Sequence, residues 1–214
     1  MSEVIVDTLK HSGNSGTANV TLASNGNVTV GADLIATKQN GCQRIILEQF
    51  FTPCDGSTIA TSAGNVTVPN VTAVLDVLES WTDVTGSAIT YTPPTGTTQV
   101  IYEYQFVYTG HDTTGFTSFR LSLDGTEVTD ARRMEESDQH LSKTITHKWA
   151  FNIGGSANAA TGRVASWSSG KEIKIQAYDY TNSNDCFLHQ LRYWENANVT
   201  DFAVKPCVGI TAIG

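Results

Sequence analysis

Several histidines and aspartates carry side chains suited to acid–base catalysis, but their spacing does not form a catalytic motif. Three pairs could each supply part of a Ser-His-Asp triad: His111 with Asp112, Asp138 with His140, and Asp179 with His189. The serine of such a triad often stands on a strained Gly-x-Ser-x-Gly turn, and no serine of this chain has a comparable setting. We therefore predict no hydrolase and no catalytic residue.

Paired carboxylates are the second arrangement that could do chemistry. A glycosidase needs two carboxyl groups at a fixed separation across the scissile bond. Glu135 and Glu136 are adjacent in the chain, whereas Asp83 and Asp124 fall in turns, where carboxylates are usually solvated. The sequence therefore predicts that the chain is not an enzyme.

The cysteines do not form a metal-binding pattern. Cys42, Cys54, Cys186 and Cys207 include no Cys-x-x-Cys pair and have no histidine at ligand spacing. We therefore expect no metal and no cofactor. The thiols are expected to be free and buried, and the alternative is a Cys42–Cys54 or Cys186–Cys207 disulfide formed after release from the cell.

Tryptophan and tyrosine are the residues best suited to recognition. Aromatic rings stack on the faces of sugars and their polar tips orient hydroxyl groups, but the same residues fill β-sandwich cores and subunit interfaces. Trp167 is flanked by serines, and Tyr180 precedes Thr-Asn-Ser-Asn-Asp, so both fall in predicted loops. We single out these two as recognition candidates.

The densest charge cluster is segment 130–138, which reads Asp-Ala-Arg-Arg-Met-Glu-Glu-Ser-Asp. Mixed charge of this kind is typical of an exposed edge strand, where it blocks unwanted sheet pairing. The alternative is an inter-subunit contact in which Arg132 or Arg133 pairs with a carboxylate of a neighbouring copy, because a guanidinium group suits bidentate ion pairs.

Composition indicates a β protein that does not bind nucleic acid. Only 16% of the 214 residues are charged, against about 25% in typical soluble domains, while Thr, Ser, Asn, Val and Gly are abundant. The net charge of −8 argues against contacts with phosphates. The chain contains no apolar run of about 18 residues and no signal-peptide pattern, so we expect cytosolic synthesis and no membrane insertion.

The elements that must position these residues are strands. Segment 100–108 alternates strictly and places Tyr102, Tyr104, Phe106 and Tyr108 on one face. Such an aromatic face would be an aggregation hazard in water, so we expect part of it to be buried between or beneath subunits. Asp124-Gly125 between two alternating runs is the strongest hairpin signal in the chain.

Further strands are predicted after residue 87, joined by turns rich in Gly, Ser and Asn. Strands of this kind call for a β-sandwich, and we assign residues 87–214 to that body and 36–86 to a connecting β-rich segment. Within the connecting segment, 42–51 is a buried strand or a short helix, with strand favoured. Segment 71–81 has helix spacing, although its β-branched start makes a strand almost as good an interpretation.

Residues 1–35 form the remaining part, predicted to be an extended N-terminal arm. Its apolar runs are too short to bury a core of their own, because isolated hairpins are marginal in water. We expect the arm to gain stability by pairing with a partner, either as an anchor on a larger assembly or by exchange between subunits.

Two stretches resemble a known class of proteins. In segment 81–101 a strand enters a Ser/Thr turn through Thr-Pro and a second apolar strand follows, as in the jelly-roll opening of fibre and appendage proteins from tailed phages, marine ones especially. Segment 6–29 is similar to the region that precedes such modules. The resemblance implies a C1q- or TNF-like trimeric jelly roll with a virion role. The chain departs from a tail fibre in being short and in lacking repeats and heptads.

Taken together, these observations predict a bacteriophage structural protein made in the host cytoplasm and carried in the virion. We expect a homotrimeric tail or head fibre subunit, with the arm binding tail, portal-proximal or capsid proteins and the body exposed for host attachment, which includes binding of a host surface glycan. The alternatives are a capsid decoration (cement) protein or a carbohydrate-binding adhesion module.

Overall fold

The computed structural model divides the chain into two compact units, Met1–Gln43 and Arg44–Gly214. In the first unit it describes three short strands: β1 (Thr8–Leu9), β2 (Val20–Leu22) and β3 (Val28–Val30). In the second unit it describes residues 44–110, 115–138, 141–181, 186–195, 197–198 and 203–214. Every regular element assigned within the described residues is a β-strand, so the all-β prediction is confirmed.

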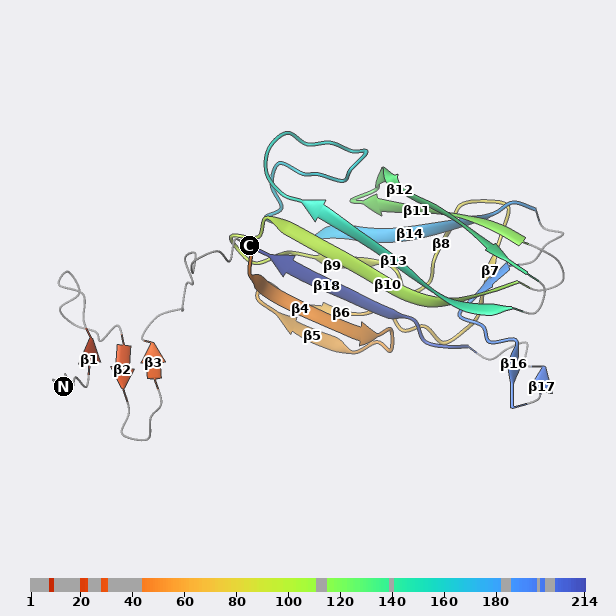
Figure 1. The fold of residues 1–214 in the computed structure, drawn as a ribbon, viewed down its shortest axis with the longest axis horizontal. Coiled ribbons are helices and arrows are strands. Elements are labelled where there is room, and N and C mark those ends of the chain that lie inside the picture. The colour runs from red at the N-terminus through yellow and green to blue at the C-terminus, as the bar shows by residue number, and fades with distance from the viewer. Residues whose placement is uncertain are drawn as a thin grey trace, which may run out of the picture. The chain divides into compact units, whose positions relative to one another are not determined.

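The first sheet of the body has β10 (Gln99–Gly110) at its centre. One edge of β10 pairs along its length with β13 (Ser142–Asn152), and its other edge pairs in succession with β18 (Cys207–Ile213) and β15 (Cys186–Leu188). Beyond these lie β4 (Ile46–Pro53) on β18 and β7 (Leu75–Val77) on β15. Figure 1 shows β13, β10, β18 and β4 side by side.

The second sheet has the order β12, β11, β14 and then two short strands. Its members are β12 (Thr126–Ser137), β11 (Gly115–Leu123), β14 (Lys171–Asp179), β8 (Thr82–Asp83) and β9 (Ile89–Tyr91). Strands β8 and β9 pair with the same edge of β14, one after the other. All strand pairs of both sheets are antiparallel.

The order of pairing is that of a jelly roll. Counted along the chain, with β8 and β9 taken as one position, the main strands are β4, β8/β9, β10, β11, β12, β13, β14 and β18. The first pairs with the last, the second with the seventh, the third with the sixth and the fourth with the fifth. This nesting folds the chain into two four-stranded layers, which is the double Greek key of a jelly roll. The predicted jelly-roll sandwich is confirmed.

Smaller elements decorate this framework. A hairpin is formed by β5 (Thr58–Thr61) and β6 (Gly64–Thr67), and β16 (Tyr193–Trp194) pairs with β17 (Ala197–Asn198). In the N-terminal unit β2 pairs with both β1 and β3. These strands of two or three residues form one small antiparallel sheet.

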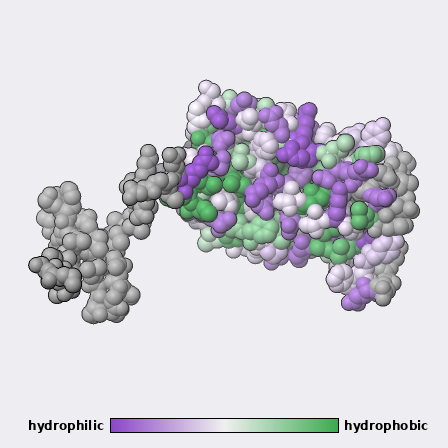
Figure 2. All heavy atoms as spheres, in the orientation of Figure 1, coloured by the Kyte–Doolittle hydropathy of each residue, from purple (hydrophilic) through white to green (hydrophobic). Residues whose placement is uncertain are grey.

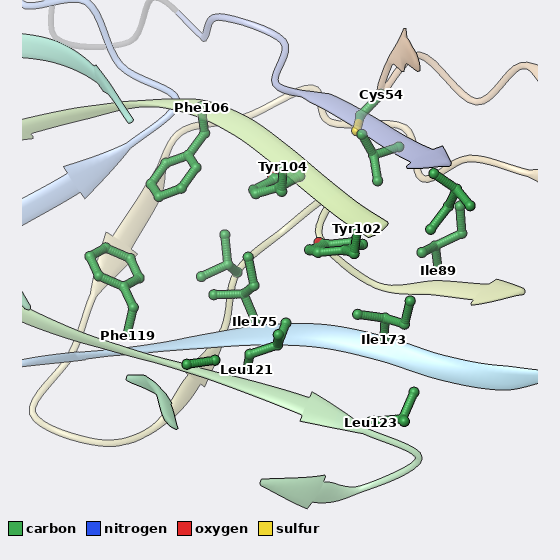
Figure 3. Packing of buried hydrophobic residues seen from close by; sticks show 14 of the residues in the cluster. Cys54, Ile89, Tyr102, Tyr104, Phe106, Phe119, Leu121, Leu123, Ile173 and Ile175 are labelled. Atoms are coloured by element: carbon green, nitrogen blue, oxygen red, sulfur yellow. The ribbon is translucent and has the colours of Figure 1, made fainter. Parts of the chain in front are cut away.

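The core lies between the two sheets and follows from the alternation of side chains along each strand. On β10 every second residue is buried, and on β14 Ile173, Ile175 and Ala177 are buried with 0% exposure. Figure 3 shows Phe106 of one sheet and Phe119 of the other pointing toward each other, and their ring centroids lie 5.6 Å apart. The alternation predicted for segment 100–108 is therefore observed, with its aromatic face turned inward.

The predicted hairpin at Asp124-Gly125 joins β11 to β12. Asp124 has φ 54° and Gly125 has φ 77°, the left-handed conformation that two-residue hairpin turns require. Leu123 pairs with Thr126 directly across this turn. A bulge between Phe119 and Leu121 then shifts the register farther along the two strands.

The segment 36–86, expected to connect arm and body, supplies strands to both layers. Its first strand, β4, falls where segment 42–51 was predicted to be a strand, and β4 pairs with the C-terminal β18. Segment 71–81, with helix spacing, contains the strand β7 instead of a helix. Of the apolar residues at helix spacing, Val71 is buried, Val74 and Leu75 are partly buried and Leu78 is 49% exposed, so the spacing did not reflect one buried face of a helix.

Candidate functional site

The aromatic face of β10 belongs to the core of a single chain. Tyr102, Tyr104 and Tyr108 have 0% exposure and Phe106 has 2%. The Tyr102 hydroxyl donates to the carbonyl oxygen of Ser87 at 2.7 Å, and the Tyr104 hydroxyl donates to that of Thr85 at 2.6 Å. Residues enclosed in this way have no surface to offer a neighbouring copy, so we replace the predicted inter-subunit role of these four residues by a core role.

Trp167 is also a core residue, contrary to the recognition role suggested by its serine-rich surroundings. Its side chain is 5% exposed, and its indole Nε1–H donates to the carbonyl oxygen of Tyr91 at 2.9 Å. Its ring meets Phe151 edge to face, with centroids 5.9 Å apart. The serines are exposed while the indole points inward, because a loop can be polar in sequence and still bury its one large apolar side chain.

Tyr180 remains exposed and keeps its place as a recognition candidate. It follows the end of β14 and is 75% exposed. Its ring meets Phe116 edge to face at 6.3 Å, and Phe116 is itself 36% exposed. Its backbone N–H donates to the carbonyl oxygen of Phe116 at 2.9 Å, which holds the two aromatic residues side by side.

Arg132 and Arg133 lie on β12, an edge strand of the second sheet, where the charge cluster was expected. The Arg132 Nε donates to Glu127 Oε1 of the same chain at 2.6 Å, and this bond holds the pKa of Glu127 below its ordinary value. The Arg133 guanidinium lies 5.9 Å from the Trp149 ring centroid and donates to the carbonyl oxygen of Arg132 at 2.8 Å. Both side chains are exposed, and an inter-subunit role for them stays a proposal.

The outer face of the second sheet carries a row of side chains that crosses its strands. Ser118 on β11 is in register with Tyr178 on β14 and with Met134 on β12. Trp81, the residue before β8, extends the row, because its ring centroid lies 5.5 Å from that of Tyr178. Met134 is 68% exposed and Trp81 is 40% exposed. The large side chains of Tyr178 and Met134 therefore lie on either side of the small Ser118 on an outward-facing surface.

A guanidinium group is bound to the indole of this row. The Arg120 guanidinium carbon lies 4.2 Å from the Trp81 ring centroid, within the range of cation–π attraction. The Arg120 Nε also donates to Gln176 Oε1 at 2.8 Å. Trp81 is thus held by contacts to β11 and β14 instead of turning freely in solvent.

Beside this row lies a hollow of ≈ 550 Å³. Its lining consists of Trp81, Ser118, Phe119, Arg132, Arg133 and Met134. The sequence analysis did not select Trp81 or Tyr178, because cross-strand register cannot be read from one strand alone. We call the six lining residues the Ser118 hollow.

The histidines do not form a catalytic arrangement in the part of the chain that the structure describes. His189 has φ 64° and 0% exposure, and His147 is 7% exposed. Their rings lie 6.2 Å and 6.0 Å from that of Phe106. The backbone N–H of His189 donates to the carbonyl oxygen of Val107 at 2.8 Å, and Asp179, its possible triad partner in the sequence, is likewise buried with 0% exposure. His111, Asp112 and His140 lie outside those residues.

Burial controls the charge state of both histidines. It lowers the pKa of His147 to about 4, with a further contribution from the positive charge of Arg133, and it lowers the pKa of His189 to about 4. No group of three or more potential metal ligands occurs within the described ranges. No helix in those ranges is long and apolar enough to span a membrane.

The described cysteines are not joined in disulfides. Cys54 and Cys186 are buried and Cys207 is partly buried, so the alternative Cys186–Cys207 disulfide is not formed. Burial, with smaller effects from nearby groups, raises the pKa of Cys54 to about 12, which keeps it a protonated thiol. Cys42 lies outside the described residues.

Comparison with known proteins gives no family assignment. No family model matches the chain, and no curated protein matches it. Solved structures of infectious bursal disease virus match at low similarity. The structure of the Gt strain gives a TM-score of 0.35 at 8% sequence identity, and the match covers 96% of this chain and 50% of that chain. The structure of the Gx strain gives a TM-score of 0.34 at 9% sequence identity, and the match covers 86% of this chain and 45% of that chain. The VP2 subviral particle of the same virus gives 0.26 at 10% identity over 74% and 46%.

The chain thus spans about half the length of the solved structures that it matches. TM-scores of this size do not establish a relationship, and the fold assignment rests on the strand pairing alone.

On the face of the body turned to the viewer in Figure 2, hydrophilic residues are scattered among hydrophobic ones.

Proposed function

We propose that this chain is a non-enzymatic structural protein of a virion. The observation that carries the proposal is the nested eight-position jelly roll, an architecture used repeatedly by viral capsid proteins and lectins. The phage-like segments 6–29 and 81–101 add to it. The two histidines of the described residues, His147 and His189, are core side chains.

The separate N-terminal unit supports an attachment role. Its strands β1, β2 and β3 have two or three residues each, too few for an independent stable sheet in water. Such strands gain stability when they add to the sheet edge of a partner, through main-chain hydrogen bonds. We propose that this unit anchors the body to tail, portal-proximal or capsid proteins and that the body faces outward.

Within this role we favour a homotrimeric tail or head fibre subunit that contacts the host surface, with a capsid decoration protein as the alternative. A trimer would need a contact surface other than the aromatic face of β10, which is enclosed in the core. Of the two arginines of β12, we propose Arg133 for this contact, because its guanidinium lies beside the Trp149 ring, whereas Arg132 is held by Glu127 of the same chain. Light scattering of the purified chain, compared with an Arg133→Glu variant, tests this: a trimer that becomes a monomer supports the assignment, and an unchanged chain that is monomeric overturns it.

The structural role itself is tested on particles. We expect the chain to be present in many copies in purified virions of the phage that encodes it, measured by quantitative mass spectrometry. A chain that carries only residues 44–214 should fold but should not be incorporated. Absence of the full chain from particles would overturn the proposed structural role. Normal incorporation of the shortened chain would overturn the proposed anchor.

A carbohydrate-binding adhesion module is the second candidate function. The specific observation in its favour is the Ser118 hollow with the exposed Trp81 at its rim. The two functions are compatible, because a virion surface protein can carry a saccharide site.

A further inference from the structure

We propose that the Ser118 hollow binds a saccharide that carries a carboxylate group. The proposal rests on the proposed function in one respect: a surface-exposed virion protein would meet such saccharides on a host envelope. It names a site and a ligand class that the recognition candidates Trp167 and Tyr180 do not supply.

The apolar wall of the hollow suits the face of a sugar ring. A pyranose presents several C–H groups on one face, and these pack against the electron-rich face of an indole or phenol ring. Trp81 lines the hollow, with Tyr178 next to it at 5.5 Å between centroids. Met134, 68% exposed on the far strand, provides a flexible apolar contact opposite them.

The floor of the hollow leaves room for a ring because the central residue is small. Ser118 lies in register between Tyr178 and Met134, so the two large side chains stand on either side of a serine. The resulting volume of ≈ 550 Å³ falls in the range of about 300–1,000 Å³ that small-molecule sites occupy. A ligand of one to a few sugar units matches that space.

The charge of the lining selects an anion. Arg132 lines the hollow, whereas the guanidinium of Arg133, another lining residue, is directed to the Trp149 ring, and the lining contains no carboxylate. Glu127 accepts a hydrogen bond from the Nε of Arg132, and the two terminal amino groups of Arg132 are the donors that we assign to the carboxylate of the ligand. This cationic lining stands out in a chain whose net charge is −8.

The indole of Trp81 and the guanidinium of Arg132 are connected through side-chain contacts, so both belong to one site. Arg120 stacks on Trp81 at 4.2 Å and lies 4.0 Å from Glu127, which in turn holds Arg132. The indole platform and the carboxylate-binding arginine are therefore linked through one set of contacts across β11 and β12. Nucleic acid fits this site less well, because the acidic chain as a whole repels a polyanion that extends beyond the hollow.

The test is a titration of the full chain with three probes, in which calorimetry and tryptophan fluorescence measure binding. The probes are tetragalacturonate, which is an acidic saccharide, cellotetraose, which is a neutral one, and tetraglutamate, which has the charge without the sugar. We expect tetragalacturonate to bind at least roughly tenfold more tightly than either of the other two probes. Added salt should weaken that binding.

Variants locate the site. Trp81→Ala and Arg132→Gln should each weaken tetragalacturonate binding by roughly tenfold or more. The matched controls are Trp194→Ala and Arg163→Gln, an exposed tryptophan and an exposed arginine outside the lining, which should change binding less than about twofold. Arg132 has an exposed side chain, so Arg132→Gln should remain folded even if Trp81→Ala does not.

Four results would overturn the proposal: no binding of tetragalacturonate, equal binding of cellotetraose, equal binding of tetraglutamate, or unchanged binding by Arg132→Gln. These results are distinct from failure of the structural role. A chain that is found in particles but does not bind tetragalacturonate overturns the saccharide site alone. A chain that binds it but is absent from particles overturns the structural role alone.

Discussion

The Tyr104 hydroxyl donates to the carbonyl oxygen of Thr85 at 2.6 Å, from the central strand of one sheet to the turn that precedes β9. The next two carbonyls of that turn are bound in the same way. The Cys54 thiol lies 3.4 Å from the oxygen of Gly86, and the Tyr102 hydroxyl lies 2.7 Å from that of Ser87. Three consecutive backbone acceptors are therefore satisfied inside the sandwich by side chains, which permits an irregular segment to be buried there.

Gly86, the glycine of this turn, should not tolerate a side chain. It has φ +91°, and a Cβ at this position would lie 2.6 Å from Val71 Cγ2 and 2.9 Å from the Tyr104 hydroxyl. Gly86→Ala should lower the free energy of unfolding by about 3 kcal/mol or more, through strain and overpacking, measured by urea denaturation. Gly96→Ala is the matched control, since Gly96 also has φ +91° but has no atom within 4 Å of its Cβ position. It should cost only about 1 kcal/mol, and equal costs would contradict this account.

Tyr102→Phe should reveal the cost of an unsatisfied carbonyl in the same turn. The change keeps the ring, which is fully buried, and removes the donor to the Ser87 oxygen. We expect a loss of about 1–3 kcal/mol in the free energy of unfolding, measured by the same denaturation. Tyr180→Phe, at a position that is 75% exposed, should be close to neutral. A neutral Tyr102→Phe would mean that the Ser87 oxygen finds another donor.

Acid should destabilise the fold through His147 and His189. Both have a pKa of about 4 in the folded chain because of burial, whereas a histidine in the unfolded chain has a pKa of about 6.5. The unfolded state therefore binds protons first, and stability falls as the pH drops from about 6.5 to about 4, by roughly 3 kcal/mol for each histidine. Urea denaturation at a series of pH values measures this loss.

A single substitution separates the two contributions. His147→Leu should flatten the dependence of stability on pH between about 6.5 and 4 by roughly half, because one of the two buried imidazoles is gone. A curve parallel to that of the unchanged chain would show that His147 does not titrate in this window. The comparison uses the slope with pH, so a general loss of stability in the variant does not affect it.

The sequence was informative where the signal was local. Alternation along segment 100–108 identified the apolar face of β10, and Asp124-Gly125 located a hairpin whose left-handed φ values only such residues adopt readily. What covers an apolar face is a non-local property, however. The aromatic face was therefore expected at a subunit interface, although strands β11 and β14 of the same chain enclose it.

The same limit applies to the candidate site. Trp167 was expected to be exposed because serines surround it, yet burial depends on where one ring points and not on the polarity of its neighbours. The Ser118 hollow was not predicted, because it depends on the register of Ser118 with Tyr178 and Met134, residues far apart in the sequence. Register of this kind is set by the pairing of whole strands.

Removal of residues 1–43 should leave the melting temperature of the body unchanged. The division of the chain into two compact units places the boundary at Arg44, and β4 begins two residues later. The strands β1, β2 and β3 are too short to contribute much buried apolar area to a subunit contact. Differential scanning calorimetry of the full chain and of residues 44–214, at several protein concentrations, measures the effect. An anchor predicts equal melting temperatures, whereas a segment exchanged between subunits predicts a lower one for the shortened chain, with a dependence on concentration that is lost on truncation.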